Sequence, residues 1–242
     1  MTLNRTISLL VLLLMLGSVA SFAAPAAEEI NGYYLPKGPT EVISPNGKQV
    51  AFLRLSEKKY AYSTDGDNPK GGMVRWPQVW IKDADGKNER MLVDVGGIAY
   101  DQKMDEVNVY DVKDLAFSLD GKWLFFTRTL ETAGHFANSW LYVVPADGSS
   151  PEKNINSVTS MELIKVGKYR GNLLVAQISN SFFKEKGWVD TRPGAQPGPY
   201  FVYGVMDSEG KIIKTLHETP GMDALGKEEY AALKQEVEGM IK

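Results

Sequence analysis

Apolar runs alternate with tight-turn residues along most of this chain. Nearly continuous apolar runs stand at residues 50–53, 123–126 and 173–176. A short apolar run between turn residues is typical of a strand that is buried on both of its faces. Residues farther along each unit, such as 211–216, alternate between polar and apolar, which is typical of an outer strand with one exposed face. The pattern therefore predicts repeated β-sheet units.

Turn residues give the strand boundaries. Asp-Gly or Glu-Gly pairs end at Gly86, Gly148 and Gly210, at a constant step of 62 residues, and Gly and Asn tolerate the positive φ that such turns need. We expect three units of four antiparallel strands. The predicted strands are 40–44, 48–55, 77–83 and 88–95 in the first unit, 109–118, 122–129, 139–145 and 152–156 in the second, and 160–168, 172–179, 199–206 and 211–217 in the third.

A fixed-period unit of short strands with Asp-Gly turns is typical of propeller blades. The predicted fold is all-β, with three four-stranded antiparallel propeller-like blades at about 38–96, 107–157 and 158–218. Three such blades cannot close a ring, so exposed sheet faces need a cover. The array stays open and is capped, or it is completed by dimerisation as a homodimer, or the chain is a fragment of a larger ancestor.

The end of the chain, residues 219–242, predicts an amphipathic α-helix. Thr219 is the expected N-cap, followed by Pro220 in the first turn. An apolar stripe among Glu and Lys residues consists of Met222, Leu225, Leu233, Val237, Met240 and Ile241. Such a stripe packs on a neighbouring surface. We expect this helix to cover an open blade face, and the alternatives are a helix packed on its own blades and a dimer contact.

The first residues resemble an export signal. Arg5 precedes a short leucine-rich run, and small residues predict cleavage after Ala23 or Ala26. The run is shorter than the roughly 20 residues of a membrane span. We therefore expect a signal peptide at 1–23, a linker at 24–37, the repeat domain at 38–218, and a periplasmic or secreted protein without a membrane span after cleavage.

The amino-acid composition argues against several classes of function. The chain has no Cys, so disulfides and thiol catalysis are excluded, and its net charge of −3 without a basic run gives no electrostatic footprint for nucleic acid.

Two turn motifs resemble a known family. Residues 44–48 (Ser-Pro-Asn-Gly-Lys) and 117–126 resemble the turn-and-strand motif of WD40-like, TolB-type β-propeller repeats, and 140–148 resembles the matching outer-strand motif. The same motif occurs in the N-terminal propeller of prolyl-oligopeptidase-family (S9) peptidases. The resemblance covers most of 38–217 and implies a fold, because these repeats serve many functions.

Irregular sequence collects at one end of the predicted strands. The long connections are 56–76, 129–139 and 180–198, together with the link 96–108, and long loops on a rigid scaffold often carry function. Aromatic and Arg side chains are enriched at protein interfaces. The candidate partner-binding residues are Tyr60, Tyr62, Arg75, Trp76, His135, Phe136, Phe183, Trp188 and Arg192. The alternative is that these aromatic residues only pack their own loops.

Catalytic and cofactor signals are weak. The sequence has no Gly-x-Ser-x-Gly, and neither His135 nor His217 has a partner at motif spacing. Asp65 and Asp67 form an incomplete Ca²⁺ ligand set, so we predict no metal site and keep these two residues only as weak candidates. We also predict no catalytic residues and no cofactor. The expected function is that of an exported, non-enzymatic binding or scaffold protein that docks a protein, peptide or envelope polymer. The alternative is an accessory or degenerate propeller component of an S9-like peptidase system.

Overall fold

The computed structural model describes residues 28–30, 33–35, 40–62, 70–95, 98–101, 106–131, 139–179, 200–219 and 225–239, in part by backbone alone. The predicted signal peptide lies outside the described residues. Two short strands of the predicted linker, β1 (Glu28–Ile30) and β2 (Tyr33–Leu35), pair with each other.

Three antiparallel sheets follow, and in each the strands are neighbours in chain order. Sheet 1 consists of β3 (Glu41–Ile43), β4 (Gln49–Tyr62), β5 (Lys70–Asp83) and β6 (Arg90–Asp94). Sheet 2 consists of β7 (Ile98–Asp101), β8 (Glu106–Phe117), β9 (Trp123–Glu131), β10 (Ser139–Pro145) and β11 (Lys153–Ser157). Sheet 3 consists of β12 (Ser160–Leu163), β13 (Leu173–Ser179), β14 (Tyr200–Met206) and β15 (Ile212–Glu218). The prediction of a mostly β fold with repeated four-stranded antiparallel sheets is confirmed.

Glycine turns close the hairpins where the sequence placed them. Gly86, Gly148 and Gly210 have φ of +84°, +70° and +91°, a region that disfavours side chains. In the turn before β9, the Ser118 hydroxyl donates to the Asp120 carboxylate at 2.6 Å, and Asp120 also accepts the Lys122 N–H at 3.0 Å. These local hydrogen bonds fix the register of the strands that follow.

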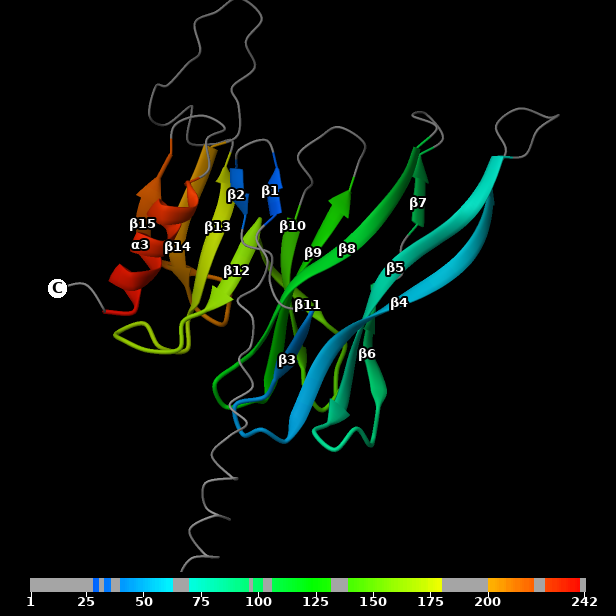
Figure 1. Cartoon of the computed structure of the whole chain (residues 1–242), viewed down its shortest axis with the longest axis horizontal. Helices are drawn as coiled ribbons and strands as arrows, with labels where there is room; N and C mark the ends of the chain where they lie inside the picture. The colour runs from blue at the N-terminus through cyan, green and yellow to red at the C-terminus, as the bar shows by residue number, and fades with distance from the viewer. Residues whose placement is uncertain are drawn as a thin grey trace, which may run out of the picture.

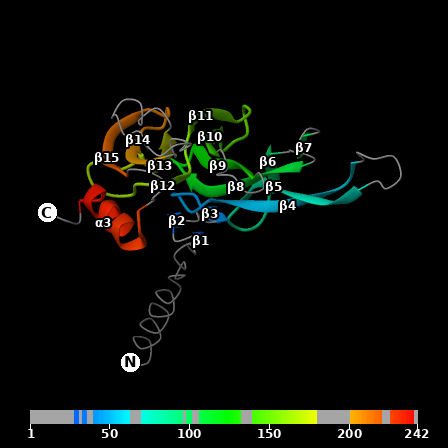
Figure 2. The same cartoon turned by 90° about the horizontal axis from the view of Figure 1, so that it is seen from above.

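The three sheets are stacked face to face, and α3 (Lys227–Val237) lies at one end. Figures 1 and 2 show the order sheet 1, sheet 2, sheet 3, α3. Adjacent residues of β9 show the packing: Phe126 belongs to the apolar cluster with sheet 1, and Phe125 belongs to the cluster with sheet 3. The prediction that these strands are buried on both faces is confirmed for 124–126 and 173–176. It is wrong for Trp123, which is 43% exposed, and for 50–53, where Phe52 and Leu53 are half-buried.

Each sheet therefore has two distinct faces. We call the face toward the preceding sheet the N-side face, and the face toward the following sheet or α3 the C-side face. The N-side faces carry Val50, Phe52 and Lys82 in sheet 1, Leu124, Phe126 and Val144 in sheet 2, and Leu173, Val175 and Met206 in sheet 3. The C-side faces carry Ala51, Val79 and Ile81, then Phe125, Leu141 and Val143, then Leu174, Tyr203 and Val205.

Helix α3 covers the C-side face of sheet 3. Its contact residues are Leu225, just before the helix, and Tyr230, Leu233 and Val237 within it. The Leu225 N–H donates to the Tyr203 hydroxyl at 3.0 Å, and burial raises the pKa of Tyr203. The helix thus covers the last sheet of the stack.

The predicted start of the helix was wrong. Gly226 is the N-cap, and its N–H donates to the Glu229 carboxylate at 2.9 Å. Thr219 instead extends the pairing with β14, since its N–H donates to the Phe201 carbonyl at 3.0 Å. The capping signal was misleading because a strand pairing used the same residue.

Other boundaries also differ. Residues 56–62 and 70–76, predicted as loop, pair as the distal part of a long β4–β5 ribbon. The link 96–108 contains β7 and the start of β8, which give sheet 2 a fifth strand. The strand predicted at 160–168 ends at Leu163. Polar and charged residues in 56–62 hid the ribbon, because cross-strand pairing can hold a strand without an apolar face.

Candidate functional site

The predicted site residues fall into two groups. Tyr60 and Tyr62 belong to strand β4, and Arg75 and Trp76 belong to strand β5. The interpretation of these four as loop residues was therefore wrong. His135, Phe136, Phe183, Trp188 and Arg192, and the weak Ca²⁺ candidates Asp65 and Asp67, lie outside the described residues. Within the first group, the structure describes the side chain of Trp76. This residue lies on the N-side face of sheet 1.

The N-side face of sheet 1 carries aromatic and cationic side chains in the cross-strand rows that the register defines. Phe52 pairs with Trp80, and Val50 pairs with Lys82. None of the described apolar clusters places another element against Phe52 or Trp80. At the rims, Ile43 on β3 is 46% exposed and Met91 on β6 is 45% exposed. Within the described residues, no apolar cluster covers this face of sheet 1, on which Phe52, Trp80 and Lys82 are half-buried, and we call it the open face.

Two cations lie over these rings. The Arg54 guanidinium carbon is 4.2 Å from the centre of the Trp80 ring and 5.5 Å from that of Phe52. The Lys82 ammonium is 4.6 Å from the centre of the Phe52 ring. Arg54 also forms an ion pair with Glu89 at 2.6 Å. Stacking of this kind is worth about 0.5–1 kcal/mol at an exposed site, so it orders the side chains more than it stabilises the fold.

Hydrogen bonds fix both tryptophan rings. The Trp76 indole N–H donates to the Asp94 carboxylate at 2.8 Å, and the Gln78 amide donates to the other oxygen of Asp94 at 3.1 Å. The Trp80 indole N–H donates to the Gln78 side-chain oxygen at 3.1 Å. Asp94 on β6 thus holds two residues of β5. Rings ordered in this way lose little rotamer freedom when another molecule packs on them.

Sheet 2 repeats part of this arrangement in a covered setting. Phe126 pairs with Tyr142 as Phe52 pairs with Trp80, and the Phe126 and Tyr142 rings are stacked with centres 5.5 Å apart. The Arg128 guanidinium carbon is 5.8 Å from the centre of the Tyr142 ring. In sheet 2 this face packs against the C-side face of sheet 1. The open face of sheet 1 is therefore the counterpart of an inter-sheet contact.

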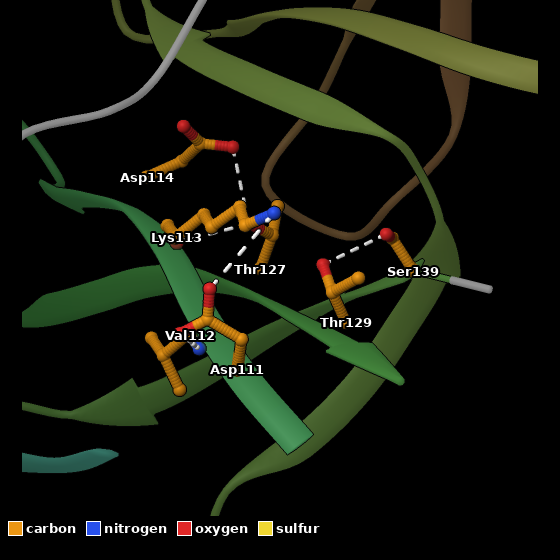
Figure 3. A network of polar contacts seen from close by, with 7 residues as sticks. All are labelled: Asp111, Val112, Lys113, Asp114, Thr127, Thr129 and Ser139. Carbon is orange, nitrogen blue, oxygen red and sulfur yellow. Dashed lines mark hydrogen bonds and ion pairs between the residues drawn. The ribbon is translucent and has the colours of Figure 1, made fainter. Parts of the chain in front are cut away.

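A separate polar network lies on sheet 2 (Figure 3). Asp114, 3% exposed with φ of +58°, accepts the Thr127 hydroxyl at 3.0 Å and the Met161 N–H of sheet 3 at 3.4 Å. The Thr129 and Ser139 hydroxyls lie 2.8 Å apart. These groups satisfy one another, so the network connects sheets 2 and 3 and we assign it no ligand.

Sequence reasoning missed Phe52, Arg54, Trp80 and Lys82. Phe52 stands in an apolar run and was interpreted as core, which is the usual place for such a residue. The available signal was the alternation along 78–82, where Gln78, Trp80 and Lys82 are separated by the aliphatic residues Val79 and Ile81. A strand that is covered on both faces would have apolar residues at nearly all of these positions.

Other site types have little support in the described part of the chain. No group of three or more His, Asp or Glu side chains is placed there to hold a metal ion. His217, on β15, is exposed, and its ring centre lies 6.4 Å from that of Tyr203. Within the same residues, no helix has the length and apolar character needed to cross a membrane.

Comparison with protein families and with curated proteins gives no match: no protein-family model matches the sequence, and no curated protein matches it significantly. The resemblance to TolB-type repeats therefore stays a prediction.

Proposed function

We propose that this chain is an exported, non-enzymatic binding or scaffold protein that docks a protein, peptide or envelope polymer. Its three sheets would be propeller-like units of the WD40-like or TolB type. The open N-side face of sheet 1, with Phe52, Arg54, Trp80 and Lys82, is the observation that carries the proposal.

The composition of this face supports docking. Trp and Arg are the residue types most enriched among binding hot spots, and here they lie together on a flat sheet face. The hydrogen bonds of Trp76 and Trp80 order the rings before a partner arrives. The β4–β5 ribbon, which carries Tyr60 and Tyr62, extends the same sheet past β3 and β6.

The absence of native cysteine allows a sharp test. A single cysteine at Met91, on the rim of this face, can carry a photo-crosslinker, and Ile213 on sheet 3 is a matched control because both side chains are 45% exposed. With an envelope extract of the source cells, we expect one specific adduct from Met91→Cys and none from Ile213→Cys.

Trp80→Ala in the Met91→Cys chain should abolish that adduct while the thermal unfolding midpoint stays within a few degrees of the parent. Trp123→Ala, an exposed Trp on sheet 2, should leave the adduct unchanged. Equal adducts at the two cysteine positions, or an adduct that survives Trp80→Ala, would reject this face as the docking surface.

A further inference from the structure

Neighbouring sheets pack on one another through the same pair of faces. The C-side face of sheet 1, with Ala51, Val79 and Ile81, packs on the N-side face of sheet 2. The C-side face of sheet 2, with Phe125 and Leu141, packs on the N-side face of sheet 3. The register places equivalent strand positions on equivalent faces, so the same type of contact is made twice.

Side-chain hydrogen bonds repeat with it. The Arg90 guanidinium of β6 in sheet 1 donates to the Ala146 carbonyl in the β10–β11 turn of sheet 2 at 2.7 Å. The Asn156 amide of β11 in sheet 2 donates to the Gly210 carbonyl in the β14–β15 turn of sheet 3 at 2.6 Å. In both cases the last strand of one sheet holds the last turn of the next.

The two ends of the stack complete this pattern. Sheet 1 has an N-side face that no described element covers. Sheet 3 has a C-side face that is covered by α3, where the other two C-side faces are covered by a sheet. A second copy of the chain therefore has, beneath its own α3, the type of face that packs on an N-side face elsewhere in the stack.

Both end faces carry charged residues: Glu162 and Lys214 lie on the C-side face of sheet 3, and Arg54 and Lys82 lie on the open face of sheet 1. Glu162 lies on β12 at the C-side face of sheet 3, because it pairs with Leu174, and its carboxylate forms an ion pair with Lys234 of α3. The open face of sheet 1 carries the cations of Arg54 and Lys82. A cation of α3 thus pairs with Glu162, and on the open face Lys82 lies over Phe52 while Arg54 pairs with Glu89.

We infer that the open face of sheet 1 docks the C-side face of sheet 3 of a second copy of this chain, and that α3 competes for that face. The inference rests on the proposed function, since it uses the same docking surface. Residues Leu174, Tyr203 and Val205 of one copy then lie on Phe52, Trp80 and Lys82 of the other. The intact chain keeps α3 in place and associates weakly with itself.

The test uses two full-length chains. The donor carries Leu233→Glu and Val237→Glu, which place charges on the buried side of α3, and also Arg54→Glu and Lys82→Glu, which disable its own open face. The acceptor is the wild-type chain. We expect native mass measurement of the mixture to show a one-to-one heterodimer, because the donor has a released C-side face and the acceptor has an open N-side face.

Two controls match these chains. A donor with Ala231→Glu and Gln235→Glu instead carries its added charges on exposed positions of α3, and should bind at least tenfold more weakly. An acceptor with Arg54→Glu and Lys82→Glu should lose binding to the same extent. A folded donor, checked by circular dichroism, that forms no heterodimer would overturn the inference, as would equal binding to both acceptors.

A milder variant covers the case of a donor that does not fold. Lys234→Glu removes the ion pair with Glu162 and leaves the apolar contacts of α3 in place. This chain should self-associate more strongly than the wild type, and no increase would contradict the inference. The mixture contains only this protein, so its result is independent of the crosslinking test with envelope extract.

Discussion

Arg54 lies over the ring of Trp80 on an open sheet face, whereas Arg128 lies over the ring of Tyr142 between two sheets. Arg54→Ala should lower the free energy of unfolding by less than about 1 kcal/mol, because both its stacking and its ion pair with Glu89 are partly exposed. Arg128→Ala should cost about 2 kcal/mol, because Arg128 lies on the same face of sheet 2 as Phe126 and its Nε atom is buried. Urea unfolding measures both. Equal losses would indicate that Arg54 is covered as well.

Substitutions at two turn glycines can distinguish the cost of backbone strain from the cost of a steric clash. A Cβ at Gly210 would lie 2.3 Å from the Ile155 carbonyl oxygen, whereas a Cβ at Gly86 would meet nothing within 4 Å. Both have positive φ, which costs about 1 kcal/mol for Ala. Gly86→Ala should show only that cost. Gly210→Ala should cost at least about 3 kcal/mol, because sheets 2 and 3 must move apart. A similar thermal midpoint for the two variants would show that the inter-sheet contact yields easily.

Helix α3 should contribute measurably to stability. Leu233 is buried against sheet 3, so Leu233→Ala should lower the free energy of unfolding by about 2–3 kcal/mol through lost burial and a residual cavity. Gln235→Ala, at an exposed position of the same helix, should change it by less than about 0.5 kcal/mol. Denaturant titration gives both values. A loss of less than about 1 kcal/mol for Leu233→Ala would mean that α3 is held loosely.

Acid stability should depend on the turn before β9. The Ser118 hydroxyl and the Lys122 N–H hold the pKa of Asp120 below its ordinary value of 3.8. A folded-state pKa that is lowered gives stability above the ordinary value, and this stability is lost as the pH falls through the folded-state pKa. Asp120→Asn should therefore flatten the fall in stability below about pH 4, measured by unfolding at successive pH values.

The equivalent turn of sheet 1 is the natural control. Asn46 accepts the Ser44 hydroxyl and the Lys48 N–H, both at 2.9 Å, and does not titrate. Asn46→Asp should add an acid-dependent contribution that the wild-type turn lacks. An unchanged acid profile in both variants would show that these turns do not influence acid unfolding.

Much of the fold followed from local patterns. Glycines with positive φ at 86, 148 and 210 gave the turns because few other residues adopt that conformation. The run 123–126 indicated a strand with apolar residues on both faces, and Leu124, Phe125 and Phe126 are buried there while Trp123 is exposed. The β4–β5 ribbon was missed because its distal part pairs without an apolar pattern to mark it.

The candidate site was harder to predict from the sequence than the fold. Trp76 was found by its residue type, but it was assigned to a loop, and Phe52 and Trp80 looked like core residues. Whether Phe52 is covered depends on which sheet precedes it in the stack, and residues 50–53 alone do not contain that information. The equivalent residue of sheet 2, Phe126, is covered, although its own strand has a similar pattern.

The repeated antiparallel units, the turns between their strands and an amphipathic helix after the last unit can all be predicted from the order of the residues. Hydrophobic period and turn chemistry act over a few residues, so these features are written locally. The cover of α3 on sheet 3 and the open face of sheet 1, with Arg54 over Trp80, appear only once the sheets are packed together. Burial of a face depends on two packed surfaces, and residues far apart in the chain supply those surfaces.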